Sequence, residues 1–170
     1  MTGATADGET VIRKYGRFFA ISGAVIVLDQ LTKALVLQHL PLHQSIPVIP
    51  GFFSFTHVHN PGGAFGFMAQ HSSPMRHWLF LVAAFFALGM ILYFYHQTPK
   101  SHSLFGGALA LIFGGAVGNM IDRLRFGEVV DFLDVYIGYM HWPTFNIADS
   151  GVTVGVAIFI FHILFKKMPI

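Results

Sequence analysis

The stretch GGAVGNMIDRLRFGEVVDFLDVYIGYMHWPTFNIADS, residues 114–150, decides how this chain is interpreted. It contains five of the chain's eight acidic residues, namely Asp122, Glu128, Asp131, Asp134 and Asp149. It also joins two apolar segments that each approach the length of a membrane span. Ionisable residues inside or beside a bilayer are costly and usually functional. Any function assigned to this chain therefore has to explain these aspartates.

The composition around this stretch is typical of a membrane protein. Of 170 residues, 54% are apolar and only 11% are charged, whereas a soluble domain has roughly 25% charged residues. A net charge of +2 gives no reason to expect nucleic acid as a partner. The absence of cysteine excludes disulfides and thiolate metal sites. The first apolar segment is long and carries Asp29 and Lys33, which is not the pattern of a cleaved signal peptide.

Four apolar segments are predicted to cross the membrane, at about 18–40, 78–95, 104–121 and 150–165, since a span needs roughly 20 residues. We predict an all-α integral membrane protein, a four-transmembrane-helix bundle forming one domain over residues 15–168. Residues 1–14 are polar and unpatterned and are predicted to be a mobile cytoplasmic tail. Lysine and arginine are in excess at both termini and in the 96–103 connection, which predicts that these lie in the cytoplasm. The stretch 114–150 then lies on the outer side.

A small sheet is expected in the connection between the first two segments. The residues Phe53, Phe55, His57 and His59 alternate with small or polar residues, which is the period of a strand. The sequence Asn60-Pro-Gly-Gly then indicates a turn. We expect this sheet to lie on the outer membrane surface. The two halves of the chain show no internal repeat, and this disfavours a transporter.

Two glycine pairs indicate close helix packing. Gly114 and Gly118 lie four residues apart in the third segment, and Gly151 and Gly155 do so in the fourth. Glycines at this spacing share a helix face and let backbones approach closely. Such packing would hold polar residues at the helix ends in register.

The first polar candidate is the pair Asp29 and Lys33, which the helical repeat places on one face. We interpret it as a mutually neutralised pair that supports the helix, with a direct catalytic role as the alternative. The third segment ends with Asn119, Asp122 and Arg123. Arg123 could pair with Asp122 or donate to a substrate carbonyl.

Asp131 and Asp149 have different surroundings. Asp131 has apolar neighbours on both sides, and Asp134 would share its helix face if this stretch were helical. Asn146 is a plausible N-cap of the fourth segment. Asp149 is then either a first-turn acid favoured by the helix dipole or a functional carboxylate. Glu128 and Asp134 are interpreted as solvated or interfacial charges.

Paired carboxylates offer the clearest chemistry. Two aspartates that share a site cannot both ionise easily, so one stays protonated. The ionised partner can activate a water, and the protonated partner can polarise a carbonyl. The residues alone do not say which two aspartates meet.

Other interpretations of the function have less support from the sequence. There is no His-Glu-x-x-His, and Pro41 separates His39 from His43, so we predict no metal and no cofactor despite ten histidines. A small proton-coupled transporter, with Asp29 and Asp122 as relay groups, is the main rival. A non-catalytic membrane scaffold is a third possibility.

Five blocks in order resemble the lipoprotein signal peptidases, also called signal peptidase II. They cover nearly the whole chain from about residue 17 to 165, and they begin at Asp29, Asn60, Gly114, Val129 and Phe145 with the sequences DQLTK, NPGGAF, GGAVGNMIDR, VVDF and FNIADS. The resemblance implies a bacterial intramembrane aspartic endopeptidase. Such an enzyme cleaves signal peptides from lipoprotein precursors just before a cysteine that carries diacylglycerol.

The resemblance also assigns roles. Asp131 and Asp149 match the family's catalytic pair, and Asp29 and Lys33 become a structural polar pair. The residues implied to support the pair or bind substrate are Asn60, Gly62, Asn119, Asp122, Arg123, Asn146 and Ala148. Pro61 and Gly63 stand where family members commonly have threonine and alanine.

The resemblance further implies where the enzyme acts and with what. We expect a monomer in the bacterial cytoplasmic (inner) membrane, in contact with membrane lipid, with its active site near the outer, periplasmic face. The expected partners are the lipid-modified prolipoprotein and a globomycin-like cyclic peptide inhibitor. The outer sheet would cradle the substrate, and a short mobile helix near 132–140 would cover the site.

Overall fold

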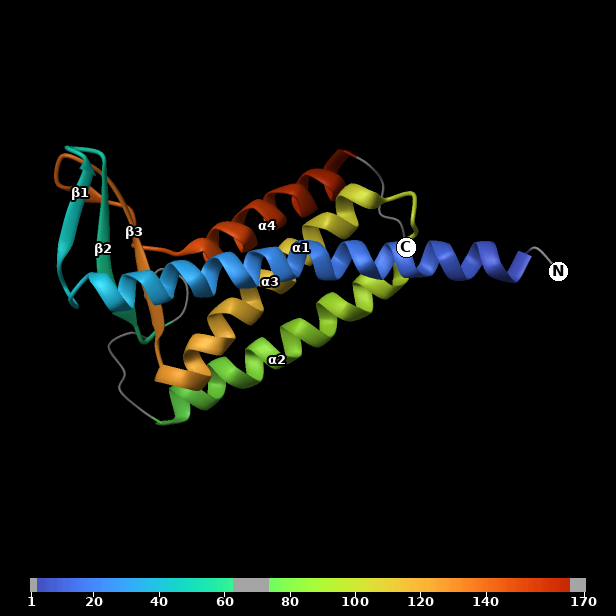
Figure 1. Cartoon of the computed structure of the whole chain (residues 1–170), viewed down its shortest axis with the longest axis horizontal. Helices are drawn as coiled ribbons and strands as arrows, with labels where there is room; N and C mark the ends of the chain where they lie inside the picture. The colour runs from blue at the N-terminus through green and yellow to red at the C-terminus, as the bar shows by residue number, and fades with distance from the viewer. Residues whose placement is uncertain (1–2, 63–73, 166–170) are drawn as a thin grey trace.

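The structure is a computed structural model that describes residues 3–62 and 74–165. Within these ranges, four helices are long and apolar enough to cross a membrane, and a small antiparallel sheet stands at one end of them (Figure 1). The helices are α1 (Gly3–His39), α2 (Pro74–Gln97), α3 (Ser103–Phe126) and α4 (Ile147–Phe165). This is the predicted membrane bundle with a small sheet.

Helix α1 begins well before the apolar segment predicted at about 18–40. The helix begins at Gly3, and its long apolar window begins at Ile12. The polar residues before the span therefore continue the helix instead of preceding it. The domain limits 15–168 and the mobility of the tail stay predictions, and residue 168 lies outside the described residues.

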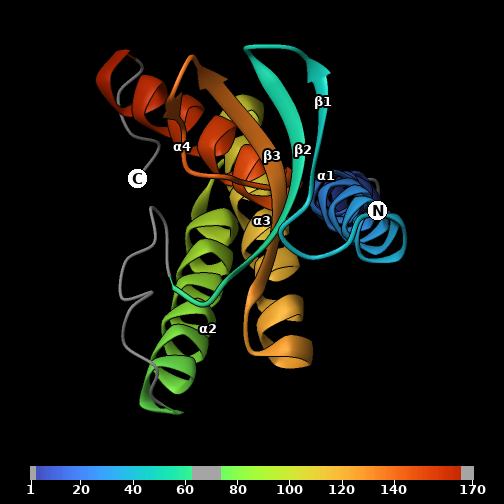
Figure 2. The same cartoon turned by 90° about the vertical axis from the view of Figure 1, so that its left-hand side faces the viewer.

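Helix α3 lies at the centre of the bundle and packs against α1, α2 and α4 (Figure 2). The predicted glycine contacts are confirmed, because a Cβ atom on Gly114 would lie 2.8 Å from the Ser22 carbonyl oxygen. A Cβ atom on Gly155 would lie 2.8 Å from the Ala108 carbonyl oxygen. Gly118 and Gly151 are similarly close to α1. Large side chains elsewhere on the helices point outward, as on α2, where Phe86 is 72% exposed.

The sheet has the strand order β1-β2-β3-β4, with β1 (Ser45–Ile49), β2 (Phe53–Asn60), β3 (Val129–Ile137) and β4 (Met140–His141). The strand predicted at 53–59 is confirmed. Strands β2 and β3 pair antiparallel, with Val58 opposite Asp131 and Asn60 opposite Val129. This pairing brings the turn that begins at Asn60 next to the first residues of β3 (Figure 2).

The short helix expected near 132–140 is wrong, since residues 129–137 form strand β3. The segment is rich in valine, isoleucine and aromatic residues, which favour strands, and β2 supplies its hydrogen-bond partner. The interpretation of Asp134 as a solvated charge is also wrong. Its side chain is buried and accepts hydrogen bonds from His141 Nδ1 at 2.8 Å and Thr56 Oγ1 at 3.3 Å.

Helix α3 is longer than predicted. It continues to Phe126 and ends at Gly127, whose left-handed φ of 79° suits glycine and whose N–H donates to the Arg123 carbonyl. Asp122 and Arg123 therefore lie within the helix, one turn before its end.

Candidate active site

A buried ion cluster joins α1 to α3. The Lys33 ammonium lies 2.9 Å from Asp29 Oδ2 and 2.8 Å from Asp122 Oδ2, and all three side chains are at most 2% exposed. The pairing predicted between Asp29 and Lys33 is present, but Asp122 is an equal partner. Arg123 does not take the Asp122 carboxylate.

The same carboxylates bind two backbone N–H groups from other elements. Asp29 Oδ1 accepts the N–H of Ala148 at 2.9 Å, in the first turn of α4. Asp122 Oδ2 accepts the N–H of Val130 at 3.1 Å, near the start of β3. The cluster thus fixes the two segments that carry Asp149 and Asp131.

Asn146 links the two candidate catalytic aspartates. Its side-chain Nδ2 donates to Asp131 Oδ1 at 2.7 Å, and its backbone N–H donates to Asp149 Oδ2 at 3.2 Å. Its Oδ1 in turn accepts the N–H of Asp149 at 2.9 Å, which is the predicted N-cap bond of α4. One fully buried asparagine therefore holds both carboxylates around a common point.

Two further asparagines donate side-chain hydrogen bonds to the two aspartates. Asn60 Nδ2 donates to Asp131 Oδ2 at 3.1 Å, and Asn119 Nδ2 donates to Asp149 Oδ1 at 2.7 Å. Asn119 Oδ1 accepts from Lys33 Nζ at 3.0 Å, which couples the ion cluster to the aspartates. Neutral amides hold Asp131 and Asp149. In the ion cluster, the Lys33 ammonium pairs with the carboxylates of Asp29 and Asp122.

The pKa of Asp131 is raised to about 7. Burial is the main cause, because it disfavours the charged carboxylate, and the negative charge of Asp149 adds to it. The hydrogen bonds from Asn60 and Asn146 and the charge of Lys33 act in the opposite direction. Near neutral pH, Asp131 can therefore both hold and release a proton.

Arg123 ties the turn after β2 to this site. Its Nη2 donates to the Gly62 carbonyl at 3.1 Å, and its Nη1 donates to the Asn119 carbonyl at 3.3 Å. Its guanidinium also lies over the Phe80 ring of α2, 5.3 Å from the ring centre. The Gly62 N–H closes the turn by donating to Asn60 Oδ1 at 3.0 Å. Gly63 lies outside the described residues.

Asp149 borders a cavity of about 520 Å³ between the 142–145 loop and the first turns of α4. Trp142, Pro143, Phe145 and Val152 give the cavity an apolar lining. A carboxylate at the edge of an apolar cavity can meet a substrate chain away from bulk water.

No group of three or more histidine, aspartate or glutamate side chains is arranged as a metal site in the part of the chain that the structure describes. His57 and His59 do share a strand face, with ring centres 5.2 Å apart. His57 Nδ1 pairs with the Leu40 carbonyl at 2.7 Å.

Comparison with known proteins identifies the family. The model of the family described as signal peptidase (SPase) II matches residues 21–165. The chain belongs to the signal peptidase II family. As a member of this peptidase family, it is a protease in a multi-pass membrane fold.

Relatives and solved structures agree with this membership. The chain is 53% identical over 153 residues to the lipoprotein signal peptidase of Desulforapulum autotrophicum, covering 90% of this chain and 94% of the relative. It is 49% identical over 144 residues to that of Geobacter sulfurreducens, covering 85% and 89%. A solved structure described as a bacterial membrane enzyme, determined in meso at 2.3 Å resolution, has a TM-score of 0.79 and 34% identity. The match covers 90% of this chain and 92% of that one.

The structure brings the sequence-predicted residues together in one place. Asp131, Asp149 and the three asparagines share hydrogen bonds, and Gly62 and Ala148 contribute backbone groups. Sequence reasoning missed Gln30, whose Nε2 donates to Asp29 at 3.1 Å, to Asp122 at 3.0 Å and to the Gly118 carbonyl at 3.2 Å. An amide side chain inside an apolar span, next to Asp29, was the signal that could have found it.

Proposed function

We propose that this chain is an intramembrane aspartic endopeptidase that removes the signal peptide from bacterial prolipoproteins, just before the diacylglyceryl-modified cysteine. Asp131 and Asp149 are the catalytic pair. The observation that carries the proposal is Asn146, which holds both buried carboxylates through one side chain and one backbone N–H. The family match and the relatives called lipoprotein signal peptidases support the substrate class.

The reaction needs one carboxyl protonated and one ionised. The ionised carboxylate takes a proton from water as the water oxygen attacks the scissile carbonyl carbon. The protonated carboxyl donates a hydrogen bond to the carbonyl oxygen and stabilises the charge that develops there. Collapse of the tetrahedral intermediate breaks the C–N bond, and a proton returned from the pair leaves with the amine. A pKa of about 7 at Asp131 suits this exchange.

The neutral asparagine donors fit this chemistry better than a lysine would. A cation bound directly to Asp131 or Asp149 would hold both carboxylates ionised. Asn60, Asn119 and Asn146 instead orient the oxygens while the pair can still retain a proton. Arg123 holds the turn at Gly62 beside the pair, where a substrate backbone would pass.

Two cavities suit the two parts of such a substrate. The cavity at Asp149 can receive the peptide next to the scissile bond. An apolar cavity of about 460 Å³ lies between α1 and the sheet, and its lining includes Leu35, Phe55 and Phe132. Phe132 directly follows Asp131 in strand β3, and successive side chains of a strand point to opposite faces. An acyl chain in this cavity would therefore lie across the sheet from the Asp131 carboxyl. A globomycin-like cyclic peptide would compete for the same surfaces.

The proposed location is the bacterial cytoplasmic membrane, with the aspartate pair near the outer face and both termini inside. Support comes from the charges of α1, where Arg13, Lys14 and Arg17 lie near the end farthest from the sheet. The pair lies at the sheet end, where translocated precursors would arrive. Lys166 and Lys167 lie outside the described residues.

The transporter alternative fits the site less well. Its relay groups, Asp29 and Asp122, are both paired to Lys33 and bound to backbone N–H groups. Both carboxylates are therefore engaged in contacts that join α1 to α3, α4 and β3, and a relay group would have to break these contacts.

The test is cleavage of a diacylglyceryl-modified precursor by the purified protein. Asp131→Asn and Asp149→Asn should each abolish turnover, because each removes one of the two proton-exchanging groups, while both variants stay folded in detergent. Asp134→Asn is the matched control, since it makes the same change at a buried aspartate of the same strand. It should retain turnover near that of the unchanged protein.

Two outcomes would contradict this function. Near-normal cleavage by either catalytic-pair variant would remove the assignment of the pair. Inhibition by EDTA that zinc reverses would point to histidine-bound metal instead.

A further inference from the structure

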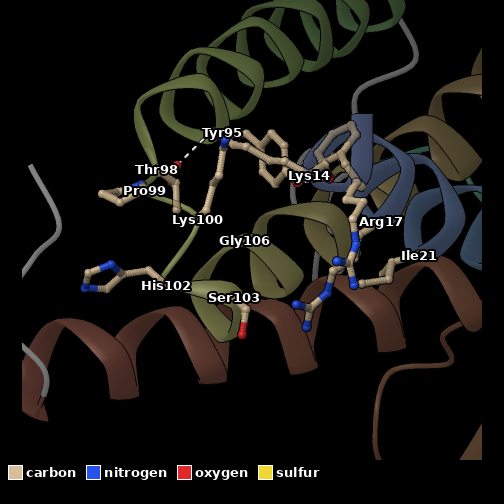
Figure 3. A pocket seen from close by; sticks show the side chains of 12 residues that line it. Lys14, Arg17, Ile21, Tyr95, Thr98, Pro99, Lys100, His102, Ser103 and Gly106 are labelled. Atoms are coloured by element: carbon tan, nitrogen blue, oxygen red, sulfur yellow. Dashed lines mark hydrogen bonds between the residues drawn. The ribbon is translucent and has the colours of Figure 1, made fainter. Parts of the chain in front are cut away.

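A second polar site lies at the end of the bundle away from the sheet. A pocket of about 370 Å³ is formed there by α1, by the end of α2 with the loop that follows, and by the start of α3 (Figure 3). Its lining includes four cationic side chains, Arg13, Lys14, Arg17 and Lys100. The lining that the structure describes contains no aspartate or glutamate.

Lys14 is used by the fold. Lys14 Nζ donates to the carbonyls of His96 at 2.9 Å and Thr98 at 2.7 Å, so it satisfies the end of α2. The Lys14 carbonyl in turn accepts the Tyr95 hydroxyl at 2.6 Å. Helices α1 and α2 are thereby held together, and the pocket has a fixed wall.

Arg13 and Arg17 are not used in this way. Neither guanidinium forms a hydrogen bond or ion pair with a group that the structure describes. The two side chains lie one turn apart on the same face of α1 and line the same pocket. Like charges gathered without an acid repel one another, and a bound anion would relieve this repulsion.

The start of α3 adds backbone donors to the pocket. Ser103 is the first residue of the helix, and it lines the pocket together with Gly106. His102, at the N-cap, makes no side-chain hydrogen bond to the first turn. The N-terminus of a helix carries a partial positive charge and suits phosphate groups.

The lining changes from charged to apolar along α1. Arg17 is followed on the same face of α1 by Ile21, and Tyr95 of α2 contributes an aromatic ring to the lining (Figure 3). Phe18 also lines the pocket. A charged entrance above an apolar floor matches a phospholipid, whose phosphate is joined to acyl chains. A free phosphate ion would have no use for the apolar part.

From these observations we propose that this pocket binds the phosphate headgroup of an anionic phospholipid. Arg13, Arg17 and the first turn of α3 contact the phosphate, and Ile21 contacts the lipid below it. The site lies at the opposite end of the bundle from the catalytic pair and does not depend on the proposed reaction. Binding there would stabilise the folded protein, because a ligand that binds only the folded state shifts unfolding.

The experiment titrates the purified full chain in neutral detergent and follows its unfolding temperature. The three probes are phosphatidylglycerol, phosphatidylcholine and inorganic phosphate. Phosphatidylglycerol should raise the unfolding temperature saturably, and the other two should not. Saturable stabilisation by inorganic phosphate at the same concentrations would show a soluble-anion site and overturn the lipid assignment. Equal effects of the two lipids would overturn the role of charge.

Three variants locate the effect. Arg17→Gln should weaken phosphatidylglycerol binding about fivefold, the effect of one basic residue at an anionic lipid surface. Ser103→Trp should weaken it at least as much with no change of charge, because the indole would fill the pocket. Arg125→Gln is the matched control, since it removes the same charge from an exposed residue near the other end of α3.

Two outcomes of the variant experiment would overturn the proposal. Equal losses in Arg17→Gln and Arg125→Gln would show diffuse attraction to surface charge and overturn the site. Full affinity in Ser103→Trp would overturn the pocket. Arg17 and Ser103 are both exposed, so both variants are expected to fold.

Discussion

Two groups of buried carboxylates lie next to each other in this membrane protein and are held in opposite ways. Asp29 and Asp122 share the Lys33 ammonium and each accept a backbone N–H. Asp131 and Asp149 accept hydrogen bonds only from neutral amides among the described residues. The first arrangement pairs carboxylates with a cation and fixes them in place, and in the second burial raises the pKa of Asp131.

Asp122 and Asp131 lie nine residues apart in the chain, yet their carboxylates have different kinds of partner. Asp122 lies near the same end of α3 as Asn119 and Arg123, yet its partner is a cation from α1. Asp131 receives the amides and has its pKa raised to about 7. In the proposed function, the hydrogen-bond donor as well as burial distinguishes a structural carboxylate from a reactive one.

The largest expected effect comes from breaking the ion cluster. Lys33→Met should lower the free energy of unfolding by about 3–5 kcal/mol, because it leaves two buried carboxylates without their cation. Chemical denaturation in detergent measures this change. The control is Lys100→Met, which removes a lysine outside the cluster and should change stability far less. Equal losses in the two variants would show that the cluster is not a supporting element.

The second prediction uses pH to separate the two groups. The folded-state pKa of Asp131 lies above the unfolded value, so the folded state binds more protons between about pH 4 and pH 7. The contribution of Asp131 to stability is therefore lost as pH rises through this window, by about 4 kcal/mol at most.

The difference in stability between the unchanged protein and Asp131→Asn isolates this contribution. That difference should change steadily from pH 4 to pH 7 in favour of the variant and be constant above pH 8. Denaturation curves at four or five pH values measure it. A difference that does not vary with pH would mean that the Asp131 carboxyl titrates normally.

A smaller effect is expected from the packing that holds the two groups together. Gly115 faces the Ala148 carbonyl and Val152, and a Cβ atom there would collide with both. Gly115→Ala should destabilise the protein by about 1–3 kcal/mol and lower turnover, because Ala148 also binds Asp29. Thermal unfolding and cleavage of the lipidated precursor measure the two effects.

Gly23→Ala is the matched control for this packing. Position 23 is also helical, and a Cβ atom there would meet nothing within 4 Å. This substitution should be neutral or stabilise the protein by up to about 1 kcal/mol, since alanine favours helix over glycine. Similar destabilisation by both substitutions would argue against a specific contact between α3 and α4.

Much of this arrangement can be predicted from sequence because it follows local periodicity. Spans, the β2 strand, the glycine pairs and the Asn146 cap all depend on residues close together in the chain. The resemblance to a family then selected Asp131 and Asp149 among the acidic residues. Polar residues at the ends of apolar segments, such as Asn119 and Asp122, indicated further members of the site.

The errors concern partners that are distant in sequence. The short helix near 132–140 was implied by the family resemblance, and it is wrong because the segment pairs as strand β3 with β2, some 75 residues earlier in the chain. Asp134 looked solvated until that pairing placed Thr56 beside it. Asp122 could not be assigned to Lys33 without knowing that α1 and α3 pack together.

The most direct test of the difference between the two carboxylate groups is the pKa of Asp131, measured by carboxyl ¹³C NMR on selectively labelled protein. The pKa should be about 7 in the unchanged protein. It should fall in Asp149→Asn, because the neighbouring negative charge is gone, yet stay above its ordinary value, because burial remains the main cause. A pKa near 4 in both proteins would contradict the shared, proton-holding pair.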